Sequence, residues 1–335
     1  MSLAVLRRNM IITMILIFGT VFVIVSLFTY IFDLGVIITV FLVLLVVLAQ
    51  WLLSPTIIKA STRLQYLKTG ENAFLESAVS SMAQKAGIPT PKVAVVPDKT
   101  PNAFVFGTSA SSATLAVHEG LLRNFRPEEI EAVIAHELGH IKHKDMMIMT
   151  AASAVPLVAY VLARGFFWTR GSRRKDAASL LAVAVLSYVV YFVSELLVLY
   201  LSRSREYFAD TYSAYLTSEP HNLRSALTKI AYGLSLSQKE SSGLRAFYIG
   251  DPQESKDEIQ TIIRRKVEYD LDRDGILDEH ELELAIQKEA KRSPFGGAND
   301  LFSTHPSTFK RLLLLKKIEE ELGRGQFKGD IYRFI

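Results

Sequence analysis

Hydrophobic residues are concentrated in four long apolar stretches of the chain. The first two cover residues 10–32 and 36–53, and a short turn separates them. The other two cover residues 146–168 and 177–201, with a basic loop between them. An α-helix needs about 20 residues to cross the hydrocarbon core of a bilayer, so the pattern predicts four membrane helices.

The third and fourth stretches each contain one ionisable residue, Arg164 and Glu195. Counted along helices at about 1.5 Å per residue, the two lie near opposite ends and are not expected to pair. Glu195 precedes Glu206 by 11 residues, which puts both on one helical face if the helix is continuous. We interpret Glu195 as a snorkelling or water-facing carboxylate, with a place in a cleft at the membrane surface as the alternative.

Between the second and third stretches the pattern changes to that of a soluble α/β unit. Residues 72–86 have the spacing of an amphipathic helix that ends at Gly87. Three β-rich runs follow, at 92–96, 102–107 and 113–117. They predict a small antiparallel sheet. An edge of this sheet, with Asn102, Ala103 and Phe104, is expected to hold an extended peptide by strand addition.

Composition agrees with a membrane protein and limits the available chemistry. Half of the 335 residues are hydrophobic and the mean hydropathy is +0.23, which points away from a purely soluble protein. The absence of cysteine excludes disulfides and thiolate ligands, and leaves histidine and carboxylates as metal donors. The net charge of +4 is too mild and dispersed to indicate nucleic acid as a partner.

One short motif combines histidine and glutamate at helical spacing. Residues 131–145 read EAVIAHELGHIKHKD, and Pro127 with the acidic residues after it favours a helix start. Each helical residue turns about 100°, so His136 and His140 project from one face and can bind one Zn²⁺. Glu137 lies beside them, placed to take a proton from a zinc-bound water rather than to bind the metal.

A catalytic zinc site needs a third protein ligand and an open fourth position. Residues 204–210 read SREYFAD and place Glu206 and Asp210 four residues apart, on one helical face. We assign Glu206 as the third ligand and Asp210 as the acceptor of the N–H of a ligating histidine. In isolation, such a pair is more often an ordinary solvated helix face.

A third motif, DLDRDGILDEHE at residues 270–281, fits the twelve-residue EF-hand loop at its diagnostic positions. The predicted Ca²⁺ ligands are five carboxylates and one backbone carbonyl, from Asp270, Asp272, Asp274, Asp278, Glu281 and, through its carbonyl, Ile276. Amphipathic helices are expected to enter over 255–269 and to leave after residue 281, with apolar faces that dock on the rest of the chain or on a second copy. The hypothesis is that Ca²⁺ orders this insertion. An acidic solvated loop is the alternative.

Taken together, the motifs resemble those of the HtpX-type membrane metalloproteases, which are kin to the CAAX prenyl proteases. The resemblance rests on HELGHIKHKD, SREYFAD, the strand with Asn102-Ala103-Phe104, and Thr304-His305-Pro306-Ser307 with Arg311. It covers about residues 1–235 and 301–322, and the EF-hand-like insertion departs from it. It implies a gluzincin fold and an enzyme that degrades membrane proteins as quality control. It also implies that His305 lies near the site, where it either stabilises the transition state or binds transiently, whereas the sequence alone equally allows a helix start before Pro306.

The predicted fold is a mainly α membrane protein with four hydrophobic helices, a zincin-type metalloprotease domain with a small antiparallel sheet, and an EF-hand-like helix-loop-helix insertion. The expected parts are a transmembrane hairpin (1–56), the first half of the protease domain with the zinc helix (57–145), a second hydrophobic helix pair (146–201), the helices with the remaining zinc ligand (202–250), the insertion (251–292) and the C-terminal protease helices (293–335).

The predicted function is that of a zinc endopeptidase in the cell membrane, with protein or peptide substrates and the lipid bilayer as partners. Basic residues beside the first hairpin favour a multi-pass protein with a cytoplasmic catalytic domain, whereas the basic loop 170–175 argues against this orientation. A prenyl-protein protease and a calcium-responsive membrane scaffold with an inactive metal site remain alternatives. An intramembrane protease of the site-2 type is disfavoured, because charged residues flank the zinc motif and place it at the membrane surface.

Overall fold

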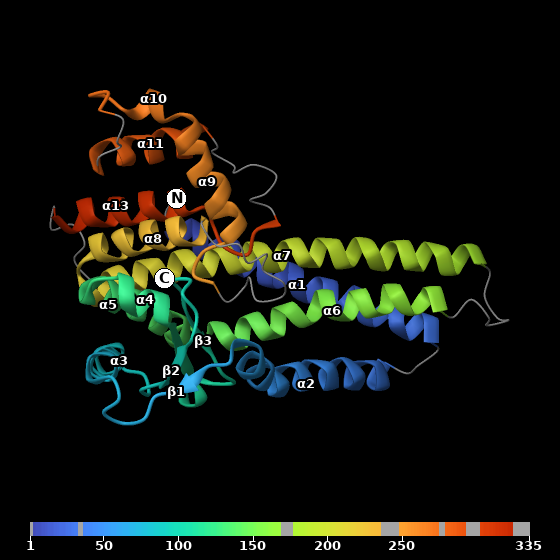
Figure 1. Cartoon of the computed structure of the whole chain (residues 1–335). Coiled ribbons are helices and arrows are strands. Elements are labelled where there is room, and N and C mark those ends of the chain that lie inside the picture. The colour runs from blue at the N-terminus through green and yellow to red at the C-terminus, as the bar shows by residue number, and fades with distance from the viewer. Residues whose placement is uncertain are drawn as a thin grey trace.

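The computed structural model describes residues 3–32, 36–168, 177–235, 248–274, 279–292 and 302–323. Most of these residues are helical. Long helices extend to one side of the molecule, and a head with a small sheet and shorter helices forms the other side (Figure 1).

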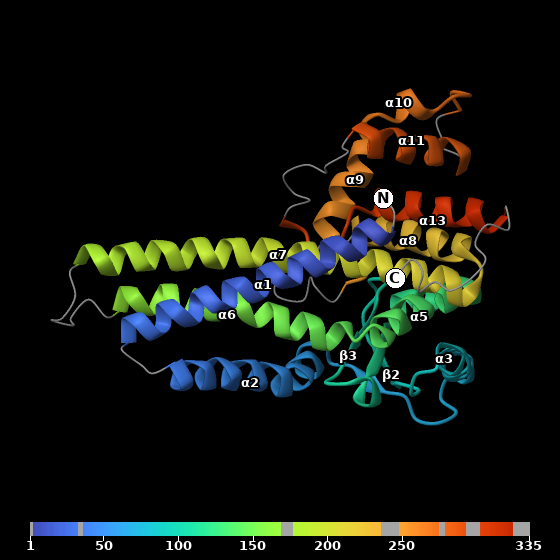
Figure 2. The same ribbon diagram turned by 180° about the vertical axis from the view of Figure 1, so that it is seen from behind.

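Four helices form the elongated part. They are α1 (Leu3–Phe32), α2 (Val36–Thr62), α6 (Asp145–Trp168) and α7 (Ala177–Thr217). α1 packs on α6 and α7, and α2 packs on α6 (Figure 2). Ile17 of α1, Ala152 of α6 and Leu201 of α7 share one buried apolar cluster. This packing joins the N-terminal hairpin to the two helices that flank the middle of the chain.

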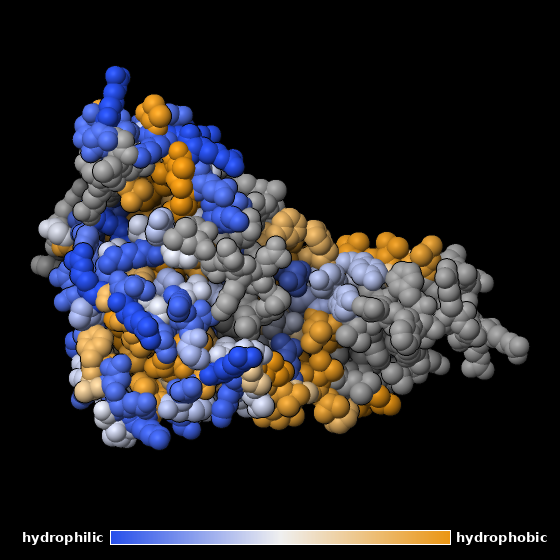
Figure 3. All heavy atoms as spheres, viewed as in Figure 1, coloured by the Kyte–Doolittle hydropathy of each residue, from blue (hydrophilic) through white to orange (hydrophobic). Residues whose placement is uncertain are grey.

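Two segments of these helices are long and apolar enough to cross a membrane, Leu44–Thr62 and Ala184–Thr217, with mean hydropathies of 1.5 and 2.0. Arg8–Ile17 and Asp145–Tyr160 are shorter apolar helical segments. Apolar side chains face outward from α1 and α2, and Figure 3 shows a largely hydrophilic head beside apolar surface on the elongated part. Within the described residues two spans are supported by length and composition, and the four-span interpretation stays a prediction.

The sheet of the head has four strands in the order β1-β2-β4-β3. The strands are β1 (Gln65–Tyr66), β2 (Lys92–Val96), β3 (Ala103–Phe106) and β4 (Thr114–His118). β1 pairs antiparallel with β2, β2 parallel with β4 (Ala94 opposite Ala116), and β3 antiparallel with β4 (Val105 opposite Leu115). The prediction of an antiparallel sheet was therefore wrong. β4, buried along its whole length, lies between β2 and β3, and β3 becomes an edge strand.

Shorter helices make up the rest of the head. α3 (Ala73–Ala86) begins after Asn72, whose side chain accepts a hydrogen bond from the Leu75 N–H, and ends at Gly87 with φ 65°. A left-handed residue of this kind is the usual helix terminator, and glycine adopts it without strain. The predicted helix is thus confirmed. α4 (Glu119–Asn124), α5 (Pro127–Lys142), α8 (Pro220–Ser235) and α13 (Thr308–Gly323) complete this part.

The insertion forms α9 (Pro252–Arg264), α10 (Lys266–Tyr269) and α11 (Glu279–Arg292), on the outer side of α8 and α13 (Figure 1). The expected single entering helix is interrupted at Arg265, which precedes α10. Ile262, Tyr269 and Ile286 are buried in the main core cluster of the head, so the apolar faces dock on the rest of this chain. The loop residues 275–278 lie outside the described residues.

Candidate active site

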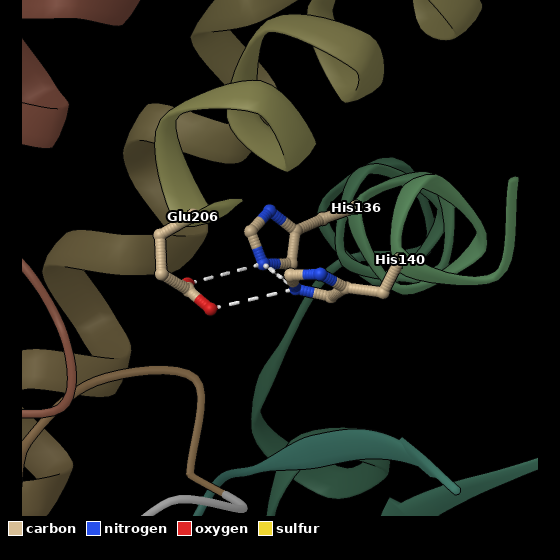
Figure 4. Close-up of side chains that lie close together, drawn as sticks. All are labelled: His136, His140 and Glu206. Atoms are coloured by element: carbon tan, nitrogen blue, oxygen red, sulfur yellow. Dashed lines mark hydrogen bonds and ion pairs between the residues drawn. The ribbon is translucent and has the colours of Figure 1, made fainter. Parts of the chain in front are cut away.

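Two helices distant in the sequence bring the three expected metal ligands together. α5 carries His136 and His140, and α7 carries Glu206 (Figure 4). The Nε2 atoms of the histidines lie 3.3 Å apart, and each lies 3.5 Å from one Glu206 oxygen. Two zinc–ligand bonds of 2.0–2.1 Å at a tetrahedral angle separate the donor atoms by about 3.3–3.4 Å. The three donors therefore fit one Zn²⁺.

The crossing of α5 and α7 depends on Gly139, between the two histidines. A Cβ atom at this position would lie 3.3 Å from Ala209 Cα and 3.2 Å from Tyr212 Cδ1. Next to this contact, the Ser213 hydroxyl donates to the Ala132 carbonyl at 2.7 Å. The glycine of the motif thus permits the close helix approach on which the convergence of the ligands depends.

Each histidine has a carboxylate beside its other ring nitrogen. His136 Nδ1 lies 3.0 Å from Asp210 Oδ1, and His140 Nδ1 lies 2.8 Å from Asp145 Oδ2. An Nδ1–H held by a carboxylate fixes the tautomer that leaves Nε2 for a metal. The sequence predicted this role for Asp210. It did not predict the same role for Asp145. The one sequence feature that could have indicated this role is the position of Asp145 just after the end of the histidine helix.

Two buried arginines hold these carboxylates. Arg311 donates to both oxygens of Asp210 from Nε at 2.8 Å and from Nη2 at 2.7 Å, and its Nη1 lies 3.3 Å from Glu206 Oε2. Arg205 pairs with Asp145 and donates to the His143 carbonyl at 2.8 Å. Both arginines stand in motifs that carried the resemblance, but sequence reasoning assigned them no role, because partners so distant along the chain are visible only in the fold.

The electrostatics of the two histidines differ. Burial lowers the pKa of His140 to about 3, so that its ring is neutral at pH 7, the form that binds a metal. Burial also lowers the pKa of His136, but the carboxylates of Asp210 and Glu206 more than offset this and raise it to about 9. The acids beside His136 thus favour a positive charge at that histidine.

Glu137 lies between the ligands and the edge strand β3. Burial raises its pKa to about 8, and Glu206 adds to this, although His136, Arg311 and a hydrogen bond with the backbone of Val105 lower the pKa. A carboxyl group in such an environment readily accepts a proton near neutral pH. The base role predicted from the motif stays a prediction.

The structure also places His305 beside the three ligands. Its side chain is buried, with Nδ1 3.5 Å from Glu206 Oε2. Its carbonyl accepts a hydrogen bond from the Ser303 hydroxyl at 2.8 Å, and the Ser303 carbonyl accepts one from Arg203 at 2.7 Å. The position before α13 that suggested an ordinary helix start is therefore also a position in the site.

A cavity of about 800 Å³ opens on this group of residues. Ala103 and Phe104 of the predicted substrate strand line it, and Glu195 lies on its wall, in agreement with the alternative that placed this residue in a cleft. Asn102 has a different place. It is buried, and its Oδ1 accepts the N–H of Ile249 at 2.9 Å, so it supports the segment beside the site.

The structure describes part of the predicted calcium loop. One carboxylate oxygen each from Asp270, Asp272 and Asp274 lies within 4.8 Å of the other two. Glu281 is buried, and its Oε1 accepts the N–H groups of Leu271 and, at 3.3 Å, Asp272. The predicted ligands Ile276 and Asp278 lie outside the described residues.

Comparisons with known proteins show the family of this chain. The family model "Peptidase family M48" matches residues 70–319, which include every residue of the metal site. A "Protease HtpX homolog" of Methanothermobacter thermautotrophicus is 38% identical over 233 residues, 69% of this chain and 87% of that protein. One of Aeropyrum pernix is 32% identical over 294 residues, covering 84% and 86%. The crystal structure of S. mikatae Ste24p matches with a TM-score of 0.46 and 20% identity, over 73% of this chain and 63% of that one. This chain belongs to peptidase family M48, together with the HtpX homologues.

Proposed function

We propose that this protein is a membrane-bound zinc endopeptidase that cleaves membrane or misfolded proteins in quality control. The convergence of His136, His140 and Glu206, with donor atoms 3.3–3.5 Å apart, carries the proposal. Membership of peptidase family M48 and the HtpX relatives support it.

The three ligands would hold Zn²⁺, which as a Lewis acid polarises a carbonyl and makes a water more acidic. The edge of β3 holds the substrate in extended form by strand addition. Glu137 takes a proton from the attacking water and returns it to the leaving amine. His305 donates a hydrogen bond to the carbonyl oxygen as it becomes negative.

The proposal includes four membrane helices and a cytoplasmic catalytic domain. Two apolar segments long enough to span, and the outward-facing apolar side chains of α1 and α2, support the membrane location. The cavity runs from the ligands to Tyr160 and Tyr191, which lie on the apolar helices α6 and α7. A substrate segment at the membrane surface can therefore reach Glu137 without leaving the neighbourhood of the bilayer.

For the insertion, we propose that the loop from Asp270 to Glu281 binds Ca²⁺. The close approach of Asp270, Asp272 and Asp274 supports this. α9 also contacts the segment that carries His305, since Glu254 accepts a hydrogen bond from Ser303 at 2.8 Å. Ca²⁺ is expected to raise the melting temperature of the purified protein and to alter its proteolytic rate. If neither quantity changed, the loop would be an acidic solvated turn.

The main test compares the wild type with Glu137→Gln on a detergent-solubilised membrane protein, with and without a chelator. The variant is expected to keep stoichiometric zinc and to lose cleavage, because only the proton acceptor is removed. Turnover retained by the variant would refute the role of Glu137.

A prenylated peptide serves as a second substrate in the same test. Preferential cleavage of that peptide would favour a prenyl-protein protease. Zinc below stoichiometry in the wild type, together with no cleavage of either substrate, would favour a scaffold with an inactive site.

A further inference from the structure

Glu195 and Glu206 face the same cavity from one helix. α7 is continuous from Ala177 to Thr217, and both residues line the cavity of about 800 Å³. Eleven residues at about 100° each leave the two side chains only about 20° apart around the helix. The face of α7 that carries the third metal ligand therefore also carries a second carboxylate, closer to the apolar end of the cavity.

Glu195 differs from the other acids of the cavity in its surroundings. Asp145 pairs with Arg205, and Glu206 lies against His136 and Arg311. Among the residues that the structure describes, no hydrogen bond or ion pair reaches the carboxylate of Glu195. A partly buried carboxylate without such a partner is unfavourable, and a cation that enters the cavity relieves this.

We propose that Glu195 is a specificity-determining residue that binds the cationic side chain of a lysine or arginine in the substrate. This inference rests on the proposed peptidase function and names its substrate class. Lysine and arginine are concentrated at the cytoplasmic ends of membrane helices. The preferred substrate is therefore a membrane protein with a basic residue next to the bilayer.

The helix also sets the distance from the cation to the cleaved bond. The rise of α7 between Glu195 and Glu206 is about 16 Å at 1.5 Å per residue. An extended peptide advances about 3.3 Å per residue. A peptide that follows the cavity thus places the cation about five residues from the scissile bond.

The test uses one cleavable membrane-protein segment in which a single lysine is moved through the positions on either side of the scissile bond. Glutamine at each position is the reference. In the wild type, lysine about five residues away is expected to raise kcat/KM about tenfold, the effect of one hydrogen bond to a charged group. Glu195→Gln should lose this preference, and Glu195→Lys should prefer glutamate there. Glu219→Gln, an exposed acid outside the cavity, should behave as the wild type.

Binding of the same peptides to Glu137→Gln protein gives a readout that does not depend on cleavage. Tighter binding of the lysine peptide, lost in the Glu137→Gln, Glu195→Gln double variant, supports the subsite. Equal affinities for lysine and glutamine peptides, or a lysine preference that survives Glu195→Gln, overturn it. Either negative result leaves cleavage by the wild type untouched, so failure of the subsite is distinguishable from failure of the peptidase proposal.

Discussion

Arg311 and Asp210 form a buried two-point ion pair in which Nε and Nη2 of the guanidinium donate to the two carboxylate oxygens at 2.8 and 2.7 Å. Asp210 Oδ1 lies 3.0 Å from Nδ1 of His136, so the arginine of α13 acts on the histidine helix through α7. The site consequently draws on three helices, and its stability depends on the C-terminal part of the chain.

Replacing Arg311 with Met leaves the carboxylate of Asp210 buried without its cation. Removal of one partner of a buried ion pair costs about 3–5 kcal/mol, so the unfolding free energy is expected to fall by this amount. Arg224→Met is the matched control, because Arg224 pairs with Glu319 at the surface and such pairs contribute about 1 kcal/mol or less. Denaturant titrations in detergent measure both. Equal losses in the two variants would contradict the buried pairing.

Asp145→Asn and Asp210→Asn each remove the negative charge next to one histidine while keeping the size of the side chain. Loss of such a partner typically lowers metal affinity by about 10–100-fold. Zinc competition with a chromophoric chelator measures the affinity, with Glu219→Gln as the control for the loss of one acid. Unchanged affinity in the Asp145 variant would show that Asp145 does not orient His140.

Gly139→Ala tests the helix crossing. The new Cβ meets Ala209 and Tyr212 at 3.3 and 3.2 Å, so α5 and α7 must separate slightly. Overpacking of this kind costs about 1–3 kcal/mol, and zinc affinity should fall because Glu206 moves away from the histidines. Gly19→Ala is the control, since its Cβ meets nothing within 4 Å. The explanation fails if Gly139→Ala binds zinc as tightly as the wild type.

Glu258 predicts a pH dependence of stability. Burial raises its pKa to about 7, although hydrogen bonds from Ser307, Thr308 and Phe309 lower it. The folded-state pKa exceeds the ordinary value of 4.5, so the folded protein binds this proton more readily than the unfolded chain does. The unfolding free energy therefore falls as the pH rises from about 4.5 to about 7.

Unfolding titrations across this pH range measure the effect of Glu258. Glu258→Gln should remove this part of the slope, because its amide stays neutral. Glu320→Gln, an exposed acid of α13, should keep the wild-type slope. A Glu258→Gln slope equal to that of the wild type would show that the carboxyl titrates normally.

Much of the candidate site follows from the sequence, since helical periodicity is a local property. His136, Glu137 and His140 are neighbours on any helix that contains them, and Glu206 with Asp210 repeat that spacing. The structure places one possible ligand atom each from His136, His140 and Glu206 within 4.8 Å of one another. The helix of α3 and its end at Gly87 are equally local, because they depend on short-range hydrogen bonds and backbone conformation.

Contacts between residues distant in the sequence do not follow from such local patterns. Nothing local shows that β4 lies between β2 and β3, or that Arg205 reaches Asp145. Strand order and buried ion pairs depend on how all elements share one core, which no short segment encodes.

Glu195 shows what the sequence determines and what only the tertiary structure decides. The sequence alone determined that it shares a helical face with Glu206, because the rotation per residue of an α-helix is constant. Only the tertiary structure decided what that face meets. Lipid, water and a cavity leading to the ligands are equally compatible with an acid in an apolar helix. The packing of α2 on α6 and of α6 on α7 selects the cavity.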